Sequence, residues 1–96
     1  MKIKEYIAKI YFLRTSEGGR KSDILNIGYS FRPLLHFNSN NYHVQIDFGE
    51  IKLIKLGAAY NLKLRVIDLC PLTKGSEFEL KEIDIIGTGE ILEILS

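Results

Sequence analysis

The sequence lacks the features that would place the protein in an oxidising compartment or in a membrane. Its 96 residues include one cysteine, Cys70, and a single thiol cannot form a disulfide within the chain. No apolar run approaches the roughly 20 residues that a membrane-spanning helix requires, and Met1-Lys2-Ile3-Lys4 is not followed by the apolar stretch of a signal peptide. We therefore expect a soluble protein of the reducing cytoplasm that does not act at a membrane.

An excess of charge of one sign is also missing. Thirteen lysine and arginine residues stand against twelve aspartate and glutamate residues, which leaves a formal net charge of +1. This balance excludes a strongly basic nucleic-acid binder, and we expect no DNA binding, although a local basic patch remains compatible with it. With 46% hydrophobic and 26% charged residues, the chain has an ordinary globular composition, and its length predicts a single domain over residues 1–96.

Residues arranged for catalysis or metal binding are missing as well. The sequence has no G-x-x-x-x-G-K-[ST] loop, so nothing in it can cradle a nucleoside triphosphate with backbone amides and a lysine. His36 and His43 flank a loop, but they have no cysteine or acid at ligand spacing and form an incomplete metal set. Cys70 lies near Asp68, whose charge would raise the pKa of the thiol rather than lower it. We therefore expect no enzymatic activity, no cofactor and no metal.

The apolar residues that are present repeat mostly at every second position, the pattern of strands with one face in a core. In residues 4–14 this alternation puts Tyr6, Ala8, Ile10 and Phe12 on one face. It also predicts strands over residues 42–48, 60–69 and 77–81, separated by turn-forming residues. Residues 87–95 fit a strand, although residues 91–95 fit a short helix equally well. Several short strands in so short a chain predict an all-β, antiparallel fold, closed as a small barrel or packed as a sandwich.

Apolar residues also occupy the opposite face of the first predicted strand. Ile7, Tyr11 and Leu13 would point outward there. Exposed apolar patches of this kind usually meet a partner or a second copy of the chain, so these three residues form a candidate partner surface. The acids near the C-terminus, by contrast, are interpreted as a solvated face: Glu77, Glu79, Glu82 and Asp84.

Three stretches carry a likeness to a known family. They are Lys9-Ile10-Tyr11-Phe12-Leu13 followed by Glu17-Gly18-Gly19-Arg20; Gly28-Tyr29 followed by Arg32-Pro33; and Asn61–Val66 followed by Pro71-Leu72, Gly75 and Phe78. In order and approximate spacing, this set resembles the C-terminal barrel (domain III) of the bacterial elongation factor Tu family, from about Tyr6 to Leu95. The resemblance implies a six-stranded antiparallel β-barrel.

In that family the barrel contributes to gripping the T-stem backbone of aminoacyl-tRNA, and it docks against the other two domains and the exchange factor. The resemblance matches the arginine of the family's E-G-G-R turn with Arg20, beside Lys21, and makes this pair a candidate RNA or phosphate contact. Two positions depart from the family: Glu82-Ile83-Asp84 stand where it has a second G-G-R, and Leu34 stands where a glutamine usually follows Arg-Pro. Because the two acids repel phosphate, these departures weaken tRNA binding.

Two functional hypotheses of different classes follow. The first is a non-catalytic binding module, a free-standing translation-factor-like barrel that acts through a protein partner or a second copy. The alternative is binding of the tRNA backbone through the Gly18-Gly19-Arg20-Lys21 turn, which could instead be a simple hairpin turn with solvated charges. A third possibility is mimicry, in which the barrel competes with an elongation factor for one of its partners.

Overall fold

The computed structural model of the protein describes residues 3–26, 31–67 and 70–95, so Gly28, Tyr29 and Asp68 lie outside the described residues. The described residues form eight strands and one short 3-10 helix. In chain order these elements are β1 (Ile3–Phe12), η1 (Thr15–Glu17), β2 (Ile24–Leu25), β3 (Leu34–Phe37), β4 (Asn40–Asp47), β5 (Leu53–Ile54), β6 (Ala59–Ile67), β7 (Glu77–Lys81) and β8 (Ile85–Ile94).

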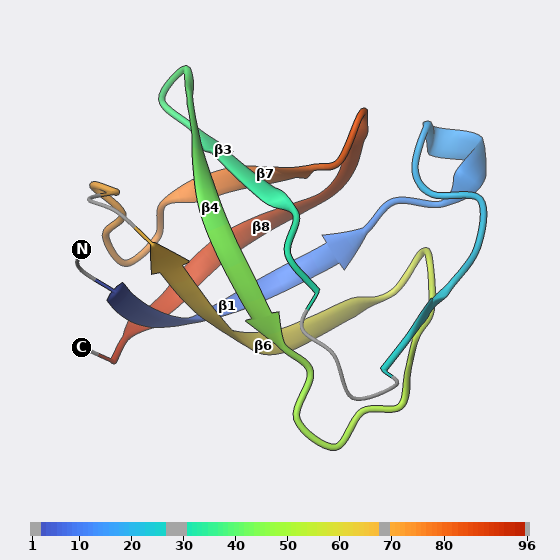
Figure 1. The fold of residues 1–96 in the computed structure, drawn as a ribbon, viewed down its shortest axis with the longest axis horizontal. Helices are drawn as coiled ribbons and strands as arrows, with labels where there is room; N and C mark the ends of the chain where they lie inside the picture. Colours follow the sequence, from blue (N-terminus) through green and yellow to red (C-terminus); the bar gives the residue numbers. More distant parts are fainter. Residues whose placement is uncertain (1–2, 27–30, 68–69, 96) are drawn as a thin grey trace.

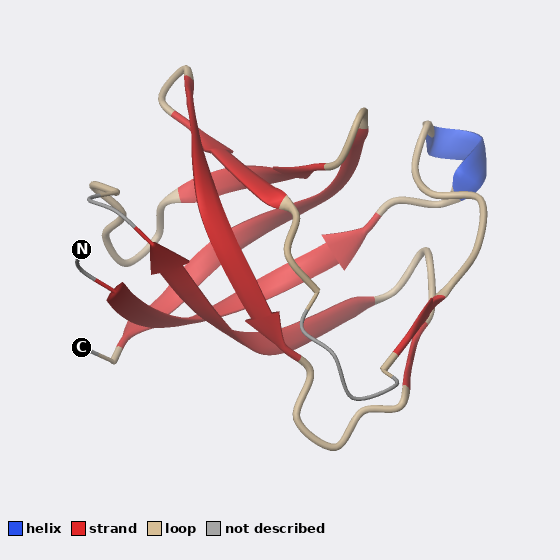
Figure 2. Ribbon diagram, viewed as in Figure 1, coloured by secondary structure: helices blue, strands red, loops and turns tan. Residues whose placement is uncertain are grey.

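Six of the strands close into a barrel, in the order β1-β6-β4-β3-β7-β8 (Figure 1). Every neighbouring pair in this order is antiparallel. The remaining two strands, β2 and β5, form a separate two-residue ladder at the side of the barrel away from the chain ends (Figure 2). The prediction of a small all-β antiparallel barrel is therefore confirmed. Within the described residues, no helix has the length and apolar character needed to cross a bilayer.

The barrel interior is filled by the inward-facing residues of the strands, as the alternation predicts. Tyr6, Ala8, Ile10 and Phe12 of β1 are fully buried. The other strands contribute further buried side chains to the same core, including Leu35, Val44, Ile46, Leu62, Leu64, Val66, Phe78, Leu80 and Ile91. Because each of these residues alternates with a more exposed one, a single wall of strands separates this core from solvent.

Strand β8 completes the barrel and settles how residues 91–95 fold. It pairs with β1 on one side and with β7 on the other, so the helix considered for residues 91–95 is wrong. Closure of the barrel gives β8 hydrogen-bonding neighbours on both edges, which a helix would forfeit. Gly89 allows close packing here, because a Cβ atom at this position would lie 2.5 Å from Cζ of Phe78.

The turn that contains Arg20 is not a hairpin. The strand before it, β1, pairs with β6 and β8, and the chain continues through η1 towards β2. Gly18 ends the 3-10 helix with φ of 92°, a left-handed conformation that favours glycine. The glycines therefore end a single helical turn rather than reverse a strand.

Candidate docking face on the outside of the barrel

The three residues of the predicted partner surface are half-buried on the outer side of β1. Ile7 lies opposite Lys63 of β6 and opposite Glu93 of β8. Tyr11 lies four residues further along β1, and Leu13 directly follows the strand. Neighbouring strands thus shield much of each apolar side chain while leaving part of it in contact with solvent.

The hydroxyl of Tyr11 is held in place by the 3-10 helix that follows β1. It donates a hydrogen bond of 2.7 Å to Oε1 of Glu17, and the same oxygen accepts the backbone N–H of Arg14 at 2.8 Å. These two hydrogen bonds, the one from Tyr11 foremost, lower the pKa of the Glu17 carboxyl. The pKa of Tyr11 is raised, mainly because its hydroxyl donates a hydrogen bond to the carboxylate of Glu17. The hydrogen bond to Glu17 therefore holds the side chain of Tyr11 in a fixed position near the end of β1.

Two adjacent hollows mark the outer side of the barrel along β8. The first has a volume of about 640 Å³ and lies across β1, β3, β7 and β8, with walls that include Lys9, Tyr11, Phe37, Glu77, Glu79 and Glu90. The second has a volume of about 730 Å³ and shares Glu79 and Thr88 with the first. Its lining includes Leu13, Glu17, Ile83, Asp84 and Ile85. We call this outer surface of β1, β8 and β7, with both hollows, the docking face; Ile7 lines neither hollow.

The first hollow is acidic. Glu77 of β7 lies directly opposite Glu90 of β8, and Glu79 lies opposite Thr88 on the same outer side. Like charges directly opposite each other destabilise a β-ladder. None of these three carboxylates forms an ion pair within the part of the chain that the structure describes. Lys9 of β1 lies opposite Glu90 and also lines this hollow, so three carboxylates stand against one ammonium group there. The first hollow therefore favours a cationic group over a phosphate.

Arg20 is engaged within the chain itself. Its Nη1 donates to Oε1 of Glu82 at 2.6 Å, and its guanidinium carbon lies 5.7 Å from the centre of the Phe31 ring. Lys21 beside it is exposed, and its ammonium group has no hydrogen bond or ion pair in the described ranges. From the sequence, Glu82 is expected only to repel phosphate, but in the structure it pairs with Arg20. The two residues are 62 positions apart, so no local pattern could have revealed the pair.

The two histidines and the cysteine do not form a site with one another. His36 lies opposite Asn41, and its Nδ1 is 2.8 Å from Oδ1 of Asn41, whereas His43 lies opposite Leu34. Among residues 3–26, 31–67 and 70–95, no three histidine, cysteine or acidic residues come together as metal ligands would. Cys70 is buried, and burial raises the pKa of its thiol to about 11. The thiol is therefore protonated and unreactive at neutral pH.

These observations define a small antiparallel β-barrel with a packed apolar core and two hollows on its outer wall. The family model described as the elongation factor Tu C-terminal domain matches residues 1–95. The chain belongs to this family, and the resemblance inferred from the sequence is confirmed. It is thus a translation-factor-like barrel, and the domain that defines its family is a non-catalytic one.

Proposed function

We propose that the protein is a binding module without catalytic activity and that it acts through a protein partner seated on the docking face. The observation that carries the proposal is the pair of hollows beside Tyr11 and Leu13. Aromatic side chains are enriched at protein interfaces, and the residues that contribute most to affinity fill pockets of the partner. The hydrogen bond from Tyr11 to Glu17 supports the proposal further, because a side chain that is already ordered loses little entropy on binding.

A capture experiment tests this proposal. The tagged protein is incubated with cytoplasmic lysate, split into RNase-treated and untreated halves, and the bound protein and RNA are identified. We expect a protein partner that survives RNase and is lost from the Tyr11→Lys variant, because a lysine would place a charge in the apolar part of the contact.

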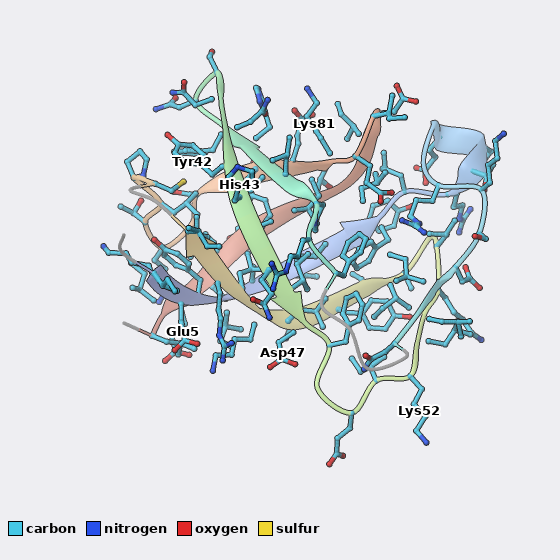
Figure 3. The ribbon with its side chains drawn as sticks, viewed as in Figure 1. Glu5, Tyr42, His43, Asp47, Lys52 and Lys81 are labelled. Atoms are coloured by element: carbon cyan, nitrogen blue, oxygen red, sulfur yellow. The ribbon has the colours of Figure 1, made fainter. Side chains whose placement is uncertain are left out.

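The matched control is His43→Lys, which adds the same charge at an exposed position of β4. Strand β4 lies three places from β8 in either direction around the closed barrel, and Figure 3 shows His43 on that strand. Equal capture of the partner by wild type, Tyr11→Lys and His43→Lys would refute the proposal. Thermal unfolding of each variant checks that a loss of binding is not a loss of fold.

A second candidate function is binding of the tRNA backbone through the turn of Gly18, Gly19, Arg20 and Lys21. It is favoured by the exposed, unpaired ammonium group of Lys21 next to the guanidinium of Arg20, within the described residues. Binding of this kind weakens steeply with salt, with a slope of about 0.7–0.9 per phosphate contact. We expect Lys21→Ala to lower the slope by the amount that corresponds to about one phosphate contact. Fluorescence anisotropy with labelled tRNA at several salt concentrations measures the slope. Affinity that does not change with salt would exclude this function.

A further inference from the structure

We propose that the second hollow of the docking face is occupied by a second copy of this chain. The occupant is the ladder of β2 and β5 with its flanking lysines, Lys52 and Lys55, which we call the β2–β5 lobe. This inference rests on the proposed function, because it identifies a second copy of the chain as the protein that binds the docking face at its second hollow.

The β2–β5 lobe presents an apolar pair at its outer surface. Leu25 and Leu53 lie directly opposite each other in the ladder, and their side chains are 60% and 38% exposed. The next positions inward, Ile24 and Ile54, are buried in the core and anchor the lobe to the barrel. The outer pair therefore stands on a fixed support, and contact with a second apolar surface would remove it from water.

Two lysines flank this apolar pair. Lys52 directly precedes β5, and Lys55 directly follows it; both are exposed. Figure 3 shows the side chain of Lys52 pointing away from the barrel. Neither ammonium group forms a hydrogen bond or an ion pair among the residues that the structure describes. Both charges are thus available to a partner.

The hollow beside Ile83 has the opposite chemistry at its edge. Ile83, in the turn between β7 and β8, is 96% exposed, the highest value among the large apolar side chains in the described ranges. Leu13 and Ile85 lie in the same hollow and give it an apolar floor. Glu17, Glu79 and Asp84 line it as well, against a single ammonium group, that of Lys81, so the hollow carries net negative charge.

The turn that carries Ile83 is held in a defined position. The backbone N–H of Glu82 donates to the carbonyl of Asp84 at 3.0 Å, and the carboxylate of Glu82 accepts the hydrogen bond from Arg20. A turn fixed at two points presents the side chain of Ile83 as a rigid anchor. Rigid apolar anchors at the centre of a contact contribute most of the affinity in typical interfaces.

The two surfaces complement each other in apolarity and in charge. Six of the twelve acidic residues lie in residues 77–96, together with a single basic residue, Lys81, so the β7–β8 region is acidic and the rest of the chain is basic. Asp23 and Glu50 also border the lobe, and Asp23 accepts the backbone N–H of Leu56 at 2.9 Å. The local charge difference is therefore modest. We expect the apolar contact to dominate and salt to weaken the association only slightly.

The position of the two surfaces suits a reciprocal dimer. Both the β2–β5 lobe and the turn between β7 and β8 lie on the side of the barrel away from the chain ends (Figures 1 and 2). A two-fold axis on that side would bring the lobe of each copy to the hollow of the other. Each contact would then be made twice, as in other isologous dimers.

Sedimentation velocity over micromolar to millimolar concentrations tests the inference. We expect reversible dimers for the wild type. Leu53→Asp and Ile83→Asp should each raise the dissociation constant at least about tenfold, because each places a charge in the apolar contact. The matched control is Ile94→Asp, a 44% exposed isoleucine that ends β8 and lines neither hollow, so this change should leave the dissociation constant unchanged. Circular dichroism checks that all three variants fold.

A mixture of the two impaired variants gives the decisive measurement. The Leu53→Asp chain keeps its hollow and the Ile83→Asp chain keeps its lobe, so a mixture restores one of the two contacts and should dimerise more tightly than either variant alone. A wild type that stays monomeric, a dimer that neither substitution weakens, or a mixture without complementation would each overturn the inference. If the wild type is monomeric but still captures an RNase-resistant protein that Tyr11→Lys loses, the self-docking inference fails while the proposed function stands.

Discussion

The hydroxyl of Tyr6 offers a test of the packing of the barrel interior. Tyr6 is fully buried, and its oxygen has no hydrogen-bond partner among the described residues. Its pKa is raised, first because burial disfavours the phenolate and then because Cys70 lies nearby. The hydroxyl thus loses its hydrogen bonds to water on folding and gains none from the described residues in return.

Replacement of Tyr6 by phenylalanine should therefore stabilise the protein. A buried hydroxyl without a partner costs about 1–3 kcal/mol, and this cost disappears with the oxygen. The ring remains in place, and the lost dispersion contacts of one atom amount to about 0.1–0.2 kcal/mol each, which offsets part of the gain. We expect a net increase of about 1 kcal/mol in the free energy of unfolding, and a rise of about 4–8 °C in Tm for a domain of this size.

Urea unfolding followed by circular dichroism measures this change, with Tyr60→Phe as the matched control. The hydroxyl of Tyr60 accepts the backbone N–H of Lys55 at 2.9 Å, so its loss should destabilise the protein by about 0.5–1.5 kcal/mol. The two tyrosine-to-phenylalanine changes are thus expected to have opposite signs. If Tyr6→Phe lowers the free energy of unfolding by about 1 kcal/mol or more, the hydroxyl is hydrogen-bonded in solution and the reasoning is refuted.

Three further stability predictions follow from individual contacts. Gly89→Ala should destabilise the protein by about 1–3 kcal/mol in urea unfolding, because the added methyl group would meet the ring of Phe78 at 2.5 Å; an unchanged midpoint would contradict this packing. The raised pKa of Cys70 contributes to the free energy of unfolding in full below pH 9, and this contribution is lost as the pH rises through about 11. Cys70→Ala should therefore make the free energy of unfolding fall less steeply with pH on the alkaline side. The pKa of Glu5 is lowered, mainly by the hydrogen bond from Arg65. Glu5 therefore stabilises the folded protein at pH values above the ordinary pKa of a carboxyl group, and this stabilisation is lost as the pH falls through the lowered pKa. Glu5→Gln should make acid unfolding less steep, and an unaltered acid limb would count against this ion pair.

The strands that line the core could be predicted because their alternation is local. Tyr6, Ala8, Ile10 and Phe12 follow one another at every second position, and a strand can bury only one such set. The two-residue strand β2 could not be found in this way, because Ile24–Leu25 is too short to show a period. Residues 91–95 fit a helix and a strand equally, and only pairing of β8 with strands distant in the sequence decides between them.

The candidate site was predictable only in part, for a similar reason. The outward direction of Tyr11 follows from its position in the first strand, but the hollows beside it depend on which strands become neighbours. Glu79 comes near Tyr11 because β8 lies between β1 and β7, and barrel closure determines that order. The pairing of Glu77 with Glu90 likewise depends on register, which no single strand encodes.

The ion pair between Arg20 and Glu82 involves a residue at which the chain departs from the family pattern. It also bears on whether the protein binds a protein partner or RNA. Where the resemblance implies a second cation, this chain has Glu82, and its carboxylate holds the guanidinium of Arg20, the residue that the resemblance makes a candidate phosphate contact. A phosphate must therefore displace Glu82 and also approach Asp84, which raises the cost of RNA binding. If the turn does bind RNA, Glu82→Gln should tighten tRNA binding and steepen the salt dependence by about one phosphate contact, because Arg20 becomes free to bind. Anisotropy with labelled tRNA measures both, with Glu77→Gln as the control that removes an equal charge outside the Arg20–Glu82 pair. Unchanged tRNA binding on release of Arg20 would exclude Arg20 as a phosphate contact and would count in favour of a protein partner.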